Sequence, residues 1–126
     1  MADTLTIKTE SVNKEDSRYY WVNIEIGDNR VGKARIKKIY RKIIIKNINI
    51  FPEFEGRGLA RKTIDLFKDT AREIIADRVR SSARGFWERM DFSDTGDGNY
   101  RWLAELGQLE GTIELDRNGE TAFKIR

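Results

Sequence analysis

The spacing of apolar residues divides the chain into strand-like and helix-like segments. Residues 4–12 alternate weakly between apolar and polar positions, and residues 19–27 alternate clearly, which predicts two strands. A third alternating strand at 33–37 follows a turn. Residues 42–51 are β-branched and apolar on both faces, which is typical of a central strand covered on both sides. Pro52, the only proline, has no N–H to donate and is expected to end this strand.

The apolar period changes in the middle of the chain. Apolar side chains then recur every three or four residues, which predicts an amphipathic helix over 58–75. A second helix is expected at 83–90, with Phe86 and Met90 facing inward. The stretch 76–82 between them is interpreted as a short strand. A loop and one more strand follow this second helix.

The last segment, about 111–126, has the pattern of a β-hairpin around Asn118-Gly119. A two-residue loop would pair Leu115 with Ala122. A three-residue loop with Gly119 in the left-handed conformation puts the apolar residues of both strands on one face, and we expect this register. It aligns Ile113 and Leu115 with Phe123 and Ile125.

Length and composition limit both the fold and the chemistry. A chain of 126 residues fits one hydrophobic core, so we expect a single domain over 1–126. The absence of Cys and His excludes disulfides, thiolate or imidazole metal sites, Ser-His-Asp triads and histidine bases, and we predict no metal site. No apolar run is long enough to cross a membrane and the start lacks a signal-peptide pattern, so we expect a cytoplasmic protein without a membrane partner.

Positive charge is concentrated in the middle of the chain. Residues 30–82 hold 15 basic and 6 acidic side chains, and no acidic residue lies between Asp28 and Glu53. The basic stretch 30–46 predicts attraction to a polyanion, either a phosphorylated cofactor or nucleic acid. The alternative is a solvated strand face whose lysines protect a sheet edge. The sequence leaves both interpretations open.

A glycine-rich turn between the apolar strand and the first helix predicts an anion-binding site. Gly56 and Gly58 let the backbone approach a ligand closely, and the N–H groups of the first helical turn would point at it. Arg57, Arg61 and Lys62 add positive charge at the same end of the helix. Gly-x-Gly by itself also occurs in ordinary strand-to-helix turns, and the stretch is neither a Walker A loop nor a complete dinucleotide fingerprint.

Two stretches, Glu55-Gly56-Arg57-Gly58-Leu59-Ala60 and residues 83–92, resemble motifs of the GNAT superfamily of acetyl-CoA-dependent N-acetyltransferases. The first is similar to the family's Gln/Arg-x-x-Gly-x-Gly/Ala loop, which cradles the cofactor's pyrophosphate; Glu55 stands where Gln or Arg is usual. The second, Ala-Arg-Gly-Phe-Trp-Glu-Arg-Met-Asp-Phe, is similar to the Ala-x-x-Phe-Tyr-Glu-Lys-x-Gly-Phe segment beside the pantetheine arm. The resemblance covers about residues 19–103.

The resemblance implies an α/β (α+β) fold, in which a mixed, mostly antiparallel central sheet is flanked by helices. It implies acetyl-CoA as cosubstrate and acetyl transfer to a primary amine, such as a protein lysine or N-terminal amine. The backbone around Ile50 would bind the thioester carbonyl, and the N–H groups from Glu55 to Ala60 would bind the pyrophosphate. The implied cofactor-binding residues are Ile48, Ile50, Glu55, Gly56, Arg57, Gly58, Leu59, Ala60, Arg61 and Phe86.

The sequence departs from the family where protons are transferred. Trp87 takes the place of the Tyr that frequently serves as general acid, and an indole N–H is a poor proton donor to a thiolate. The central strand offers Asn47 and Asn49 but no carboxylate. Glu25 on the adjoining strand or Glu53 at the strand's end would therefore act as general base through water, unless each is simply a solvated carboxylate.

The acceptor side is reduced relative to the family. The helices that usually lie between the first two strands shrink to about residues 12–18, and Asp91 replaces a usual Gly. An open site suits a flexible amine on a macromolecule. A second hypothesis is a non-catalytic GNAT-like module whose residues 30–46 bind nucleic acid or an acidic protein, and the loss of Tyr at position 87 favours it. The sequence leaves a monomer and a homodimer open.

Overall fold

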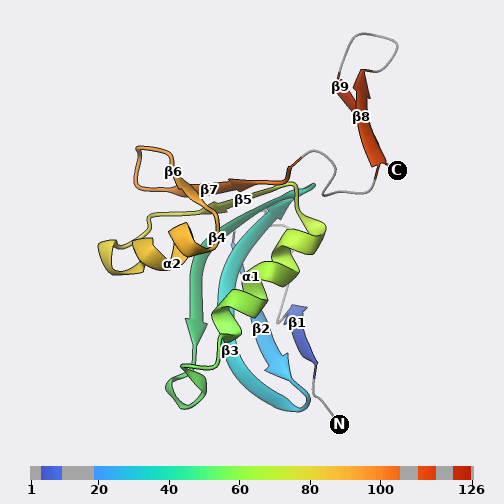
Figure 1. The fold of residues 1–126 in the computed structure, drawn as a ribbon. Helices are drawn as coiled ribbons and strands as arrows, with labels where there is room; N and C mark the ends of the chain where they lie inside the picture. The colour runs from blue at the N-terminus through green and yellow to red at the C-terminus, as the bar shows by residue number, and fades with distance from the viewer. Residues whose placement is uncertain (1–3, 10–18, 106–110, 116–120, 126) are drawn as a thin grey trace.

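A computed structural model of the chain describes residues 4–9, 19–105, 111–115 and 121–125. Within them, seven strands form one sheet in the order β1-β2-β3-β4-β5-β7-β6 (Figure 1). The strands are β1 (Leu5–Thr9), β2 (Tyr20–Ile26), β3 (Asn29–Ile39), β4 (Lys42–Ile50), β5 (Glu73–Ala76), β6 (Ser93–Asp94) and β7 (Tyr100–Leu103). Only β4 and β5 pair in parallel. The predicted mixed, mostly antiparallel sheet is therefore confirmed.

The alternation along β2 and β3 produces one buried face, as predicted. Val22 and Ile24 of β2 are 2% and 0% exposed. Ala34 and Ile36 of β3 are buried on the same face. β3 is longer than the expected 33–37, because its pairing with β2 continues to the turn and its pairing with β4 continues to Ile39.

β4 lies in the middle of the sheet, as predicted, but it is not covered on both sides by described residues. Arg35 pairs with Asn47 whereas the next residue of β3 pairs with Ile45, so Lys46 is an extra residue in β4. This β-bulge keeps Ile45 and Ile48 on the same, core-facing side. Asn47 and Asn49 on the opposite face are exposed, which corrects the expectation of a fully covered strand.

The first helix, α1 (Leu59–Thr70), is shorter than predicted. It covers one face of the sheet, where Ile64 and Phe67 are 0% and 5% exposed (Figure 1). The prediction of a helix to residue 75 is wrong, because the chain becomes extended at Ala71 and continues as β5 beside β4. Ile74 fits the helical period by coincidence; it is completely buried, but on a strand.

The second helix, α2 (Arg84–Arg89), lies within the predicted range. Two short 3₁₀ turns precede it in the sequence: η1 (Pro52–Phe54) lies before α1, and η2 (Ser81–Ala83) lies directly before α2. Trp87 and Met90 are buried, and Phe86 is half-buried and packs against the core, so the predicted inward orientation of Phe86 and Met90 is confirmed. The predicted strand at 76–82 is also wrong, because β5 ends at its first residue. No helix in the described part of the chain is long and apolar enough to cross a membrane.

The C-terminal hairpin forms a separate two-stranded sheet of β8 (Gly111–Leu115) and β9 (Thr121–Ile125). Its register pairs Ile113 with Phe123 and Leu115 with Thr121. This register confirms the predicted alignment and excludes the alternative pairing of Leu115 with Ala122. The predicted left-handed Gly119 lies outside the described residues.

Candidate active site

β4 extends beyond the end of its neighbour β5, which opens a gap in the sheet. Ala76 is the last residue of β5 and pairs with Ile45, and the N–H of Asp77 donates to the Ile45 carbonyl at 2.9 Å. β4 itself continues to Ile50. From the bulge onward, no described strand lies on the β5 side of β4.

Two backbone N–H groups of β4 face this gap. The N–H of Phe51 donates to the Val31 carbonyl on the β3 side at 2.9 Å. Successive residues of a strand direct their N–H groups to opposite sides, so those of Ile48 and Ile50 point away from β3. The gap therefore presents paired donors of the kind that stabilise a carbonyl oxygen as it gains negative charge.

A cavity of about 490 Å³, here called the glycine-loop cavity, lies beside the start of α1. It brings together eight of the ten cofactor-binding residues that the family resemblance implies. These are Ile50, Glu55, Gly56, Gly58, Leu59, Ala60, Arg61 and Phe86. Phe54, Arg89 and Met90 complete the lining. Of the other two implied residues, Ile48 lines a different cavity, and the Arg57 guanidinium lies over the Phe54 ring at 5.6 Å.

The loop before α1 leaves backbone donors open to this cavity. Gly56 and Gly58 have φ values of 81° and 73°, a left-handed conformation that other residues rarely adopt. Gly58 is the N-cap and supplies no side-chain acceptor. The first intrahelical bond runs from the Lys62 N–H to the Gly58 carbonyl at 3.1 Å, so the N–H groups before Lys62 lack a helical acceptor. Together with the helix dipole they favour an anion here.

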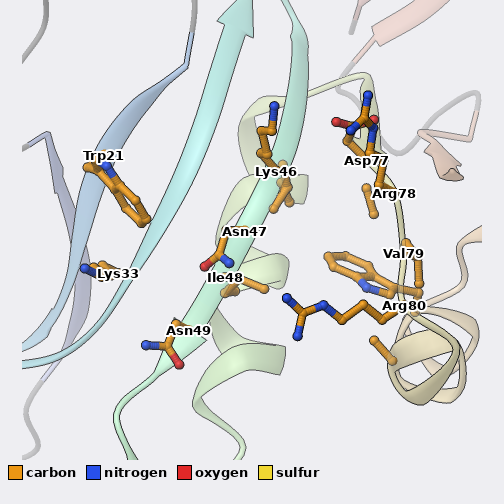
Figure 2. Close-up of a pocket in the computed structure, with 14 residues that line it drawn as sticks. Trp21, Lys33, Lys46, Asn47, Ile48, Asn49, Asp77, Arg78, Val79 and Arg80 are labelled. Atoms are coloured by element: carbon orange, nitrogen blue, oxygen red, sulfur yellow. The ribbon is translucent and has the colours of Figure 1, made fainter.

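A second cavity of about 440 Å³, the β4–β5 cavity, occupies the gap between β4 and the segment 77–80. Figure 2 shows Asn47 and Asn49 on β4, with the Arg80 side chain reaching toward them from the opposite wall. The charged lining consists of the cations Lys33, Lys46, Arg78 and Arg80 and the carboxylate Asp77. Two tryptophans, Trp21 and Trp87, also line it.

The wall from 77 to 80 is held by a neighbouring loop. Arg78 has a φ of 54°, which is unfavourable for a residue with a side chain. Its N–H donates to Asn99 Oδ1 at 2.8 Å, and the N–H of Val79 donates to the Gly98 carbonyl at 2.8 Å. These bonds fix the conformation that places Asp77 and Arg80 in the β4–β5 cavity.

The family model described as the acetyltransferase (GNAT) family matches residues 2–92. The chain belongs to the GNAT family. Solved structures share its fold. The Bacillus subtilis N-acetyltransferase YlbP in complex with coenzyme A has a TM-score of 0.61 at 14% identity, over 80% of this chain and 97% of that chain. The Escherichia coli ribosomal-protein-S18-alanine N-acetyltransferase has a TM-score of 0.58 at 12% identity, over 83% of this chain and 97% of that one.

An acetyltransferase from Thermus thermophilus is 22% identical, with a TM-score of 0.58, over 71% of this chain and 66% of that structure's chain. A search of curated proteins gave no sequence match. At these identities the structural likeness concerns the fold. The residues of this GNAT domain must therefore be assessed on their own geometry.

Of the three predicted catalytic residues, Trp87 alone is among the described residues that line the glycine-loop cavity or the β4–β5 cavity. Glu25 forms an ion pair with Lys8 at 3.2 Å, and it lines neither cavity. Glu53 is exposed in η1 and lines neither cavity. Trp87 is 5% exposed and packs edge-on against Phe86 and Phe92, with ring centroids 5.1 and 4.8 Å apart.

Asp77 is a functional candidate that sequence analysis missed. It is the one carboxylate among the residues described as lining the β4–β5 cavity. The sequence hypothesis treated 76–82 as a strand and gave Asp77 no role. Its position in the sequence could have indicated it. Asp77 directly follows the apolar run Ile74, Ile75 and Ala76, which forms the strand beside β4. Burial and the nearby Asp77 charge both raise the pKa of Tyr19 above its usual value.

The structure divides the basic stretch 30–46 of the GNAT domain between two faces. Lys33 and Lys46 line the β4–β5 cavity. Lys38 lies on the opposite face of β3, beside Ile36 and Phe67. Lys38 is therefore separated from a ligand that binds at Lys33 and Lys46.

Proposed function

We propose that this chain transfers an acetyl group from acetyl-CoA to a primary amine. The observation that carries the proposal is the free edge of β4 between Ile48 and Ile50. Ile48 lines the β4–β5 cavity and Ile50 lines the glycine-loop cavity, so one cavity lies at each end of the segment that carries the open backbone donors. A donor substrate bound in one cavity and an amine bound in the other would react at that edge.

The glycine-loop cavity has the donors and shape that coenzyme A requires. The N–H groups at the start of α1 suit the pyrophosphate, and Arg61 and Arg89 offset the negative charge of Glu55. Phe86 and Met90 give an apolar wall for the pantetheine arm. The N–H groups of Ile48 and Ile50 would hold the thioester oxygen. The complexes with coenzyme A among structures of the same fold support this assignment.

Acetyl-CoA supplies a thioester whose carbonyl carbon is attacked by the amine nitrogen; the C–S bond breaks, an amide forms, and the amine's proton is released. The chain has to accept that proton. We assign this role to Asp77, acting directly or through one water, because it lines the cavity from which the amine would approach. Trp87 forms part of the wall of the β4–β5 cavity. Because a thiol is a comparatively strong acid, the thiolate can leave without a proton from the protein, and water protonates it afterwards.

A pair of matched variants tests the cofactor assignment. Gly58 and Gly96 have φ values of 73° and 88°, and an added Cβ at either position meets no atom within 4 Å. Gly58→Glu and Gly96→Glu therefore carry the same backbone strain and the same new charge, but only the first lies at the glycine-loop cavity. Acetyl-CoA at a hundred times its Kd should stabilise the parent and Gly96→Glu by about 2.7 kcal/mol. Gly58→Glu should show no such rise in Tm.

No rise in the parent's Tm at millimolar acetyl-CoA would refute the proposal.

A second candidate function is a non-catalytic module, and the buried Trp87 at the family's acid position favours it. That candidate replaces the first if the parent binds acetyl-CoA but acetylates no peptide amine across pH 6 to 9.

A further inference from the structure

We propose that the acceptor amine is carried by an acidic peptide segment, which binds in the β4–β5 cavity; this inference rests on the acetyl transfer proposed above. One carboxylate, Asp77, and four cations line the cavity. An amine followed by acidic side chains has the complementary arrangement of charge. The carboxylate would attract the ammonium group, and the cations would bind the acidic side chains.

The four cations have no carboxylate partner within the part of the chain that the structure describes. Lys33 Nζ lies 4.6 Å from the ring centroid of Trp21, and Lys46 Nζ lies 4.9 Å from that of Tyr19. An aromatic ring orients a cation without neutralising it. Arg78 and Arg80 are exposed. All four charges are therefore available to a bound anion.

The cations come from both walls of the cavity. Lys33 and Lys46 belong to β3 and β4, whereas Arg78 and Arg80 belong to the segment after β5. Figure 2 shows Lys33 and Asn49 on one side of the gap and the Arg80 guanidinium between the walls. A peptide in this gap would have positive charge on either side along its length. The same charges would repel a polyamine or a lysine-rich tail.

The neutral lining also suits a peptide. Asn47 and Asn49 are exposed on β4, and each amide can both donate to and accept from a peptide backbone. Trp21 offers an apolar surface beside them. A nucleic acid would satisfy the cations but has no aliphatic amine to accept an acetyl group. The proposed reaction therefore favours the peptide.

Acetylation of three peptides of equal length tests the proposal. Each has a free N-terminal amine, followed by aspartate and glutamate, by neutral residues, or by lysine and arginine. With the full chain and saturating acetyl-CoA, kcat/KM should be at least about tenfold higher for the acidic than for the basic peptide. This difference in kcat/KM should shrink as the salt concentration rises about tenfold, from 0.05 to 0.5 M, because salt screens charges that are partly exposed.

Matched charge reversals locate the effect in the cavity. Lys33→Glu/Lys46→Glu should reduce kcat/KM for the acidic peptide by about tenfold or more and improve the basic peptide. Lys38→Glu/Arg41→Glu changes the net charge equally, but Lys38 lies on the other face of β3 and Arg41 in the β3–β4 turn. This control should keep the parent's preference for the acidic peptide.

The outcomes separate this inference from the function on which it rests. Without an acetyl-CoA-dependent rise in Tm the proposed function fails. If acetyl-CoA binds and peptides are acetylated, but the basic or neutral peptide is preferred, the acidic acceptor is refuted. If no peptide is acetylated and a short single-stranded RNA binds with an affinity that Lys33→Glu/Lys46→Glu abolishes, the cavity belongs to a nucleic acid and the inference is overturned.

Discussion

Gly32 allows β3 and β4 to approach closely next to the candidate active site. It is buried in β3, opposite Ile50 of β4. A Cβ at this position would lie 2.5 Å from the backbone oxygen of Asn49 and 3.1 Å from both Cα and Cδ1 of Ile50. The nearest atom belongs to the backbone, so no side-chain rotation can relieve the clash. Gly32→Ala must therefore displace the Asn49–Ile50 peptide.

The expected cost follows from two opposing effects. Overpacking a tightly packed site costs about 1 to 3 kcal/mol, and a backbone contact belongs in the upper part of that range. Replacing Gly by Ala restricts the unfolded chain, which returns about 0.4 to 1 kcal/mol. Gly32→Ala should thus lower the free energy of unfolding by about 1 to 2.5 kcal/mol. The affinity for acetyl-CoA should also fall, since the N–H of Ile50 moves.

Gly85→Ala is the matched control. An added Cβ there lies 3.0 Å from Arg89 Nη1, the end of a flexible side chain that can move away. Gly85 lies in α2, where Ala is the better helix former, so this variant should be more stable than the parent by about 0.5 to 1 kcal/mol. Urea unfolding at 25 °C measures both variants. Equal or greater stability of Gly32→Ala would refute the close approach, and an unchanged acetyl-CoA Kd would refute the role of the Ile50 N–H.

Four further predictions address the site and its surroundings. Asp77→Asn should lower kcat by about 10²- to 10⁴-fold, whereas Glu25→Gln should leave kcat unchanged; an equal kcat for the two variants would contradict the assignment. Trp87→Tyr should raise kcat by restoring a proton donor. No gain in kcat between pH 6 and 9 would show that the side chain at position 87 lines the cavity without taking part in proton transfer. Asp91 has a φ of 69°, so Asp91→Gly should raise the free energy of unfolding by about 0.5 to 1 kcal/mol in urea titrations; a loss would show that the aspartate has a compensating contact. A neighbouring side-chain hydroxyl donates to Asp97 and lowers its pKa below 3.8, so this carboxylate should stabilise the fold above that pH and lose its effect as the pH falls through the lowered pKa. The difference in stability between Asp97→Asn and the parent at pH 7 should therefore shrink in acid, and a difference that does not change with pH would contradict this.

Local periodicity was sufficient for the elements that depend on near neighbours. The alternation over residues 19–27 puts Val22 and Ile24 on one strand face, because side chains two apart share a face, and both are buried in the structure. The glycine loop and the start of α1 followed from conformational preferences at Gly56 and Gly58. The family motifs lie in these same local segments. The sequence by itself therefore determined the family, the sheet class and the position of the glycine loop.

The tertiary structure alone decided which residues share a cavity. Ile74 fits a helix as well as a strand, and only pairing with β4 made it part of β5. That parallel pairing places Asp77 across the gap from Lys33, although 44 positions separate them in the chain. Glu25 was a plausible base in the sequence, but the register of β1 and β2 brings Lys8 to its carboxylate. Contacts of this kind depend on strand register and on a crossover through α1, and neither is encoded in the spacing of neighbouring residues.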